Sequence, residues 1–240
     1  MSNMFNGCGQ TEMTTFSLGS QFDTSKVQNM SGMFQNFGQK LETLSLESNF
    51  YTNEVTDMSN MFNGCGTTSL TTFGLGNEFN TSKVQNMSGM FQNFGQNLES
   101  LSLGSHFYTN EVTDMSNMFN GMGSTSMTTL TLGDNFNTEK VENMSGMFQN
   151  CGTTALTSLE LGDQFYVTAV TDMSNMFNGC GTTAMTVLDL GSAFTKIADT
   201  NTGFATSLGN AGTTIYAPES IYSSQKGFKL NATSTTTIEL

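Results

Sequence analysis

The 240-residue chain has no Arg, no Trp, a single Pro and a single His, and only 11% of its residues are charged. Seven Lys stand against 20 acidic residues, which gives a net charge of −13. Such a chain repels phosphate backbones and anionic lipids, and it lacks the Arg side chains that most often contact bases in nucleic-acid grooves. We therefore expect no nucleic-acid partner.

Long apolar runs are also missing. No segment approaches the roughly 20 apolar residues that a membrane-spanning helix needs, and no basic segment precedes an apolar one at the amino terminus. The sequence predicts no transmembrane segment in this chain. It does not have the composition of a disordered chain either, because charge is low and 10% of the residues are aromatic.

What the chain has in excess is Met and Phe, with 18 and 20 residues, and a repeat places most of them. The dipeptide Met-Phe recurs every 28 or 29 residues, with its Met at positions 4, 33, 61, 90, 118, 147 and 176. An eroded copy over residues 197–204 brings the expected number to about eight. One copy cannot bury its own apolar side, so we expect the copies to stack as coils of a solenoid.

Each copy contains two predicted elements. Asp57 is followed by apolar residues at 58, 61, 62 and 65, the spacing of one helix face, and would cap a short helix. Residues 70–75 read Leu-x-x-Phe-x-Leu, an alternation that predicts a strand with one buried face. The sequence thus predicts an α/β repeat solenoid of about eight coils of 28–29 residues, with a parallel β-sheet on one face and short helices on the other.

Consecutive copies also alternate in detail. Asp at positions 57, 114 and 172 alternates with Asn at positions 29, 86 and 143. This alternation indicates a repeating unit of two coils, about 57 residues long.

Two motifs resemble those of a known family. Residues 55–65 read Val-Thr-Asp-Met-Ser-Asn-Met-Phe-Asn-Gly-Cys, and residues 22–27 read Phe-Asp-Thr-Ser-Lys-Val. With their repetition over residues 1–204, they resemble the BspA-like leucine-rich repeats of surface proteins and lipoproteins from Gram-positive bacteria and mycoplasmas. The resemblance implies a leucine-rich-repeat-like fold and an extracellular or cell-surface location.

The repeat also sets the expected organisation of the chain. Residues 1–204 form the predicted solenoid, and residues 205–240, which lose the motif, would form the last strand and a C-terminal cap. Met1 occupies the position of Met58, so the chain starts in mid-coil. We expect either a piece of a longer chain or a first coil that a partner covers.

Candidate chemistry in the repeat is sparse. The four cysteines, Cys8, Cys65, Cys151 and Cys180, share one repeat position that Phe or Met fills in other copies, so we expect buried free thiols. A Cys151–Cys180 disulfide stays open as an alternative, since neighbouring coils would bring the two within range. His106 falls in a variable loop, and no catalytic or metal-binding motif is found. We expect no enzyme activity, no cofactor and no bound metal.

The outward positions of the predicted strands form the candidate binding face. Short hydroxyl side chains dominate it, and two carboxylates lie near its end. The residues are Thr15, Ser17, Thr43, Ser45, Thr72, Ser100, Ser102, Thr129, Thr131, Ser158, Glu160 and Asp189.

Three functions follow as hypotheses. The first is a non-enzymatic, secreted or surface-anchored interaction or adhesion module that binds a protein or a glycan through this face. The second is a structural subunit that self-associates through its uncapped N-terminal coil and forms extracellular filaments. The third is an ice-binding surface made of the Thr and Ser rows.

Overall fold

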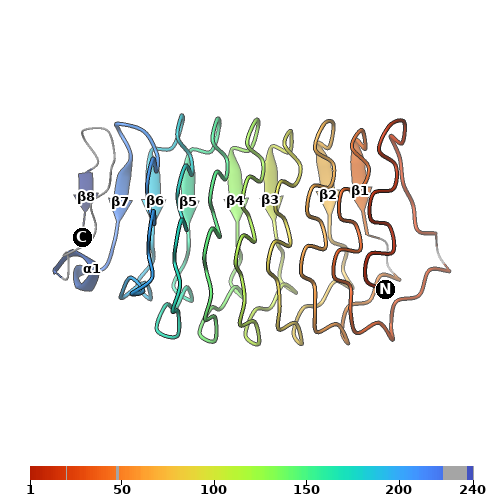
Figure 1. Cartoon of the computed structure of the whole chain (residues 1–240), viewed down its shortest axis with the longest axis horizontal. Helices are drawn as coiled ribbons and strands as arrows, with labels where there is room; N and C mark the ends of the chain where they lie inside the picture. Colours follow the sequence, from red (N-terminus) through yellow and green to blue (C-terminus); the bar gives the residue numbers. More distant parts are fainter. Residues whose placement is uncertain (20, 47–48, 224–236, 240) are drawn as a thin grey trace.

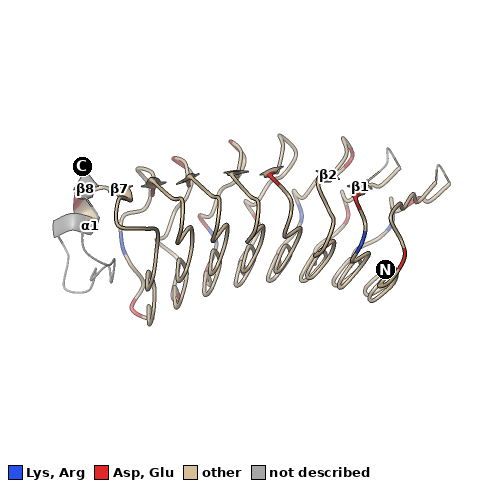
Figure 2. Ribbon diagram, turned by 90° about the horizontal axis from the view of Figure 1, so that it is seen from above, with Lys and Arg blue, Asp and Glu red and all other residues tan. Residues whose placement is uncertain are grey.

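The computed structural model describes residues 1–19, 21–46, 49–223 and 237–239. The chain forms a parallel β-solenoid of about six turns, with its coils side by side along the long axis (Figure 1). Figure 2 shows the strands and the stacked turns on different sides of this solenoid. The repeat architecture predicted from the sequence is therefore confirmed, whereas the count of eight coils is not.

The strands are short and occupy the predicted part of each repeat. Their bounds are β1 Thr43–Ser45, β2 Thr72–Gly74, β3 Ser100–Ser102, β4 Thr129–Thr131, β5 Ser158–Glu160, β6 Val187–Asp189, β7 Thr214–Tyr216 and β8 Thr237–Glu239. The central residue of β1, Leu44, is fully buried, while Thr43 and Ser45 on either side are exposed. This alternation is the one expected of a strand with a single buried face.

The predicted short helices are not confirmed, because the Met-Phe segments form successive turns. In the third copy of the repeat, Met61 N–H donates to the carbonyl of Met58, three residues earlier, as in a turn. Phe62 N–H donates instead to Met90 of the next coil, at 2.9 Å. Asn60 has φ 56° and Gly64 has φ 67°, and these left-handed residues interrupt any helix. The helical spacing of apolar residues thus arises from a chain of turns. Within the described part of the chain, the one α-helix is α1, Glu219–Ser223.

The Asp57 carboxylate accepts from one backbone N–H and from one side-chain amide. Its Oδ1 accepts from Ser59 N–H at 2.9 Å, which closes a turn in place of a helix end. Its Oδ2 accepts from the amide of Asn29 in the preceding coil at 3.1 Å. The Asp and Asn positions also form a continuous row of parallel bridges from Asn29 to Thr200. This row, on the turn side, holds neighbouring coils together throughout.

The two-coil unit has a steric cause in the left-handed positions. In the coils from Asn3 to Gly179, two of these positions hold one Asn and one Gly, and the two residue types exchange places from one coil to the next. A Cβ on Gly64 would lie 2.6 Å from Oδ1 of Asn36 in the preceding coil, and a Cβ on Gly89 would lie 2.5 Å from Oδ1 of Asn60. Each Asn side chain therefore occupies space that only Gly can leave open in the next coil.

The core consists of apolar side chains repeated in columns along the solenoid. In one column, Phe34, Phe62 and Phe91 stack with ring planes within 6° of parallel and centroids 5.5–5.6 Å apart. A second column joins Phe50, Phe79 and their successors at 6.2–6.5 Å. Met in the turn positions is fully buried from Met30 to Met176. Identical residues in identical places explain the Met and Phe excess of the composition.

The C-terminal region leaves the repeat pattern. β7 pairs with β6 on one side and with β8 on the other, all in parallel. Pro218 follows β7 and precedes α1, where its missing N–H costs no ladder bond. Residues 224–236 and 240, which make up much of the predicted cap, lie outside the described residues.

Candidate functional site: the strand face and its seams

The structure places the predicted face residues of β1 to β6 in matching positions of successive coils. Thr43 pairs with Thr72 in the register of β1 and β2, Ser100 with Thr129 and Ser102 with Thr131 in that of β3 and β4. All six are exposed. The hydroxyl rows predicted from the sequence therefore exist as a geometric feature.

Some predicted face residues depart from these rows. Thr15 and Ser17 are exposed, but their segment is not a strand, and the first strand is β1. Ser158 is half-buried, and so is Asp189, whose Oδ1 accepts from the N–H of Gly191 at 2.9 Å. Glu160 is exposed beside them. Asp189 thus closes a turn within its own coil, and Glu160 is the more accessible carboxylate at this end of the face.

The strand sheet is interrupted at two places. Hydrogen bonds join β1 to β2, β3 to β4, and β5 through β8, but none joins β2 to β3 or β4 to β5. We call these two interruptions the β2/β3 seam and the β4/β5 seam. The turn-side bridges continue across both, since Asp57 pairs with Asn86 and Asp114 with Asn143. The coils therefore stay stacked on the turn side while the strand side is open at the seams.

The bonds missing at the β4/β5 seam can be identified from the paired strands. Leu103 N–H donates to Thr131 O at 3.2 Å between β3 and β4, and Leu161 N–H donates to Asp189 O at 2.9 Å between β5 and β6. The equivalent bond at the seam would run from Leu132 N–H to Glu160 O, and it is not formed among the described residues. An amide or carbonyl left without any partner costs about 1–3 kcal/mol, so these groups bond to water or to the polar atoms of a ligand.

Glycine contacts show the same opening independently. A Cβ on Gly191 would overlap the carbonyl oxygen of Gly162, across the closed β5–β6 pair. A Cβ on Gly162 itself, on the side of the β4/β5 seam, would meet nothing within 4 Å. The coils are thus in backbone contact on one side of β5 and apart on the other.

A cavity of about 260 Å³ lies at the β4/β5 seam. Three hydroxyls and two carboxylates line it, together with three leucines and two glycines. The lining residues are Thr129, Leu130, Thr131, Leu132, Gly133, Asp134, Ser158, Glu160, Leu161 and Gly162. Four of them belong to the candidate face predicted from the sequence: Thr129, Thr131, Ser158 and Glu160.

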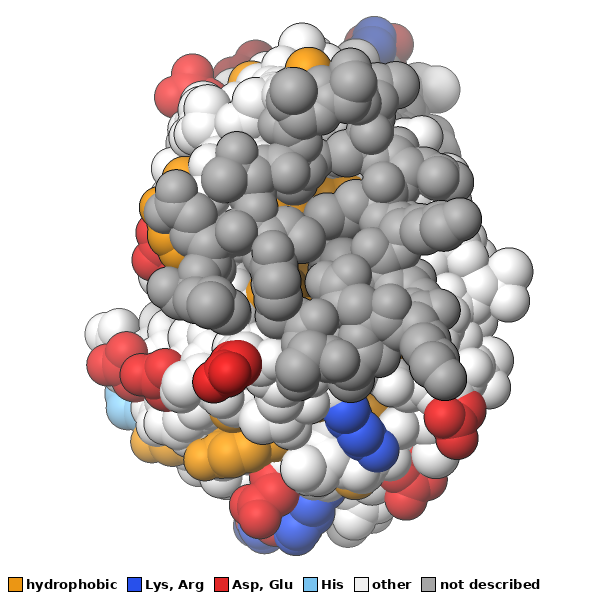
Figure 3. Space-filling view, turned by 90° about the vertical axis from the view of Figure 1, so that its left-hand side faces the viewer, with side chains coloured by type: hydrophobic (Ala, Val, Ile, Leu, Met, Phe, Trp, Pro, Cys, Tyr) orange, Lys and Arg blue, Asp and Glu red, His pale blue; other side chains and the backbone are white. Residues whose placement is uncertain are grey.

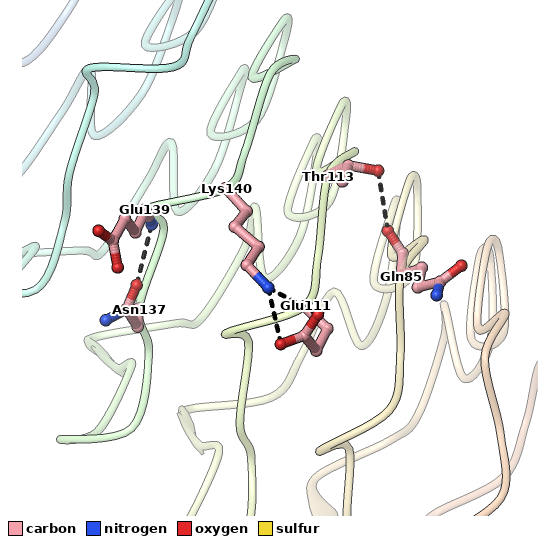
Figure 4. A network of polar contacts seen from close by, with 6 residues as sticks. All are labelled: Gln85, Glu111, Thr113, Asn137, Glu139 and Lys140. Atoms are coloured by element: carbon pink, nitrogen blue, oxygen red, sulfur yellow. Dashed lines mark hydrogen bonds and ion pairs between the residues drawn. The ribbon is translucent and has the colours of Figure 1, made fainter.

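Ion pairs connect coils away from the strands. Lys83 Nζ lies 2.8 and 2.9 Å from the two carboxylate oxygens of Glu54, and Lys140 Nζ lies 2.7 and 2.8 Å from those of Glu111 (Figure 4). The hydrogen bond and charge of Lys83 lower the pKa of Glu54. These pairs are exposed and recur after 57 residues, so they follow the two-coil unit.

Comparison with known proteins assigns the repeat to a family. The family described as "Mycoplasma protein of unknown function, DUF285" matches residues 1–127 and 72–189. The chain belongs to the DUF285 family. No curated protein and no solved structure matches it.

The cysteines of this DUF285 chain are all free. Cys65, Cys151 and Cys180 are buried as predicted, but Cys8 is exposed, because its coil has no neighbour on one side. Burial raises the pKa of the Cys65 thiol. The hydrogen bond that the Cys180 thiol donates to the neighbouring Cys151, together with burial, raises the pKa of Cys180. The two thiols lie in contact without a disulfide.

Other candidate chemistry is sparse in the part of the DUF285 chain that the structure covers. No group of three or more His, Cys, Asp and Glu side chains there is arranged to hold a metal ion. His106 is exposed on its loop. No helix among the described segments has the length and apolar character needed to cross a bilayer.

A row of buried threonines was not predicted from the sequence. Thr24, Thr52, Thr81, Thr109 and Thr138 are each 1% exposed. Their hydroxyls donate to backbone carbonyls of the following coil at 2.6–2.7 Å. The spacing of these threonines at 28 or 29 residues was the signal that could have shown them.

Proposed function

We propose that this DUF285 chain is a non-enzymatic interaction module that binds a protein or a glycan through its strand face. The observation that carries the proposal is the set of exposed hydroxyls in register on paired strands, such as Thr43 with Thr72 and Ser100 with Thr129. A rigid solenoid presents such side chains at fixed intervals over a long surface, as repeat proteins that bind partners do.

The resemblance to BspA-like surface repeats supports the same proposal and adds a location. Under it the chain acts outside the cell or on its surface, as an adhesion module. The net charge of −13 favours partners that are neutral or basic. Figure 3, which faces the C-terminal end, shows acidic side chains at several points around the rim and fewer lysines.

The test is binding of the purified chain to immobilised panels of glycans and of extracellular-matrix and cell-surface proteins. The variant Thr43→Lys/Thr72→Lys places two long charged side chains on the hydroxyl rows of β1 and β2. We expect it to weaken binding at least about tenfold, since a central contact contributes on the order of 1–2 kcal/mol.

The matched control is Gln28→Lys/Gln85→Lys, which makes the same number of substitutions to Lys at exposed positions outside the strands. It should bind as the unmodified chain does. Equal loss in both variants, or no binding to either panel, would contradict the proposal.

A second candidate is self-association through the N-terminal coil, and the exposure of its methionines favours it. Met1 and Met4 are 40% and 48% exposed, whereas their equivalents Met58 and Met61 are fully buried against the preceding coil. Phe5 is only half-buried, and its equivalent Phe62 is fully buried. A coil from a second copy would cover this face in the way neighbouring coils cover one another.

Sedimentation velocity at micromolar concentrations, with electron microscopy for filaments, tests this candidate. The chain should form oligomers that Met4→Lys converts to monomers, and Thr43→Lys should leave them intact. A chain that is monomeric throughout the concentration range would exclude self-association.

A further inference from the structure

We infer that the cavity at the β4/β5 seam is a binding site for one pyranose ring of a neutral or amino-substituted glycan. The inference rests on the proposed function, because it makes the strand face a glycan-binding surface and the seam its specific subsite. It uses a feature that the hydroxyl rows alone do not provide, namely an opening between two strands.

The size of the cavity limits the occupant. Its volume of about 260 Å³ lies just below the range of about 300–1,000 Å³ typical of sites for drug-sized ligands. A single sugar ring suits such a space, whereas an extended peptide would have to run past strands of only three residues each. Leu130, Leu132 and Leu161 of the lining are only 3–5% exposed, so contacts with a ring in this cavity are chiefly polar.

The walls present donors and acceptors in alternation. Between closed strands, Val187 N–H donates to Thr157 O and Leu161 N–H donates to Asp189 O. The equivalent groups at the seam are Ser158 N–H, Leu132 N–H and Glu160 O, which have no partner in the described structure. A sugar hydroxyl both donates and accepts, so one ring can satisfy N–H and C=O groups on facing strands together.

Side chains at the edge of the cavity add further hydrogen-bonding groups and determine which ligand charge the cavity accepts. The hydroxyls of Thr129 and Ser158 belong to equivalent first positions of β4 and β5. Glu160 and Asp134 add two carboxylates, and no Lys lines the cavity. Carboxylates accept well from sugar hydroxyls and attract an ammonium group, but they repel another carboxylate. The site should therefore accept a neutral sugar or an amino sugar and reject a uronic acid.

Saturation-transfer difference NMR on the whole chain tests the inference with methyl β-D-glucopyranoside, glucosamine and glucuronic acid as probes. The first two should show transfer and the third should not. Ser158→Tyr and, from the facing strand, Thr131→Tyr would each place a ring in the seam and abolish transfer. Two variants on opposite strands keep the test valid if one of them fails to fold, as checked by circular dichroism.

Thr43→Tyr is the matched control, because it adds the same side chain at an exposed strand position on the closed β1–β2 pair. It should bind both sugars as the unmodified chain does. Glu160→Gln removes one of the two carboxylates that line the cavity and should reduce the preference for glucosamine over glucuronic acid several-fold.

The outcomes separate this inference from the proposed function. If no probe binds, or if transfer persists in Ser158→Tyr and Thr131→Tyr, the seam site is wrong, and the strand rows of β1 and β2 can still bind a protein or a larger glycan. If the sugars bind at the seam but the chain binds no partner on either panel, the strand face is not an interaction module for proteins or larger glycans, and the seam site stands.

Discussion

The hydroxyl of Thr81 donates to the backbone carbonyl of Tyr108, 2.6 Å away in the following coil. Thr81 is 1% exposed, so neither group of this bond can turn to water instead. The same bond recurs along the solenoid and joins each coil to the next beneath the surface. This hydrogen bond connects neighbouring coils in the interior, although Thr is a residue type usually found on the protein surface.

Replacing Thr81 with Val should destabilise the chain by about 1–3 kcal/mol, because the buried carbonyl of Tyr108 loses its donor. The side-chain shape is nearly unchanged, and Val167 occupies the same repeat position in a later coil, fully buried. Urea unfolding followed by circular dichroism measures the loss. Thr81→Ser, which keeps the hydroxyl, is the control and should lose less. Equal stability of Thr81→Val and the unmodified chain would show that the bond contributes nothing.

Gly64→Asn should also destabilise the chain, although Asn readily adopts a positive φ. A Cβ at position 64 would lie 2.6 Å from Oδ1 of Asn36, so the new side chain is forced into occupied space, at about 1–3 kcal/mol. Gly104→Asn is the matched control, since Gly104 has φ 79° and a Cβ there meets nothing within 4 Å. A drop in melting temperature is expected for the first variant and little change for the second. If both variants lose the same stability, the loss is caused by the backbone conformation and not by the contact with Asn36.

Thiol labelling should distinguish Cys8 from the other three cysteines. Cys8 is exposed, and Cys65 is fully buried with a raised pKa, so little of Cys65 is present as the reactive thiolate. In the native chain a maleimide should label Cys8 within minutes and Cys65, Cys151 and Cys180 only after unfolding, as mass spectrometry of peptides will show. Rapid native labelling of Cys65 would mean that its coil opens. Loss of two thiols without labelling would reveal a Cys151–Cys180 disulfide.

The Lys83–Glu54 pair should give a small pH dependence in the acid range. Lys83 lowers the pKa of Glu54 in the folded chain, so folding favours the ionised carboxylate. The contribution is present above the ordinary glutamate pKa and is lost as pH falls through the lower folded value. Both side chains are exposed, so the effect is small and salt reduces it. An NMR titration should show the Glu54 carboxyl pKa rising in Lys83→Ala, while Glu111, paired with Lys140, stays unchanged. An unaltered Glu54 would contradict the pairing.

Much of the fold could be predicted because the same residue pattern occurs seven times. The alternation around Leu44 and its equivalents marks the strands from β1 onward, whereas the same alternation around Phe16 forms none. The helices were wrong because turns with Asn or Gly in the left-handed region space apolar residues as a helix does. The Asn and Gly residues at these positions were the signal for turns in place of a helix, for example Asn60 and Gly64 in one coil and Gly89 and Asn93 in the next.

The candidate face could be predicted in part for the same reason. Outward strand positions follow from alternation, so Thr43 and Thr129 were identified without a structure. The seams could not be predicted, because β4 and β5 have sequences as compatible with pairing as β5 and β6. Whether two such strands pair depends on how coils spread apart over the whole array. The cavity, which exists only where they separate, therefore required the three-dimensional structure.

The exchange of Asn and Gly between neighbouring coils imposes a parity rule on this protein. Removing or duplicating one coil would bring two coils of the same type into contact. At one left-handed position an Asn would then face another Asn, where Asn36 now faces Gly64. Removing or duplicating two coils keeps each Asn opposite a Gly at both positions. Descendants of such a gene should therefore differ in length by even numbers of coils, and a binding face built on these strands would grow or shrink in steps of one strand pair.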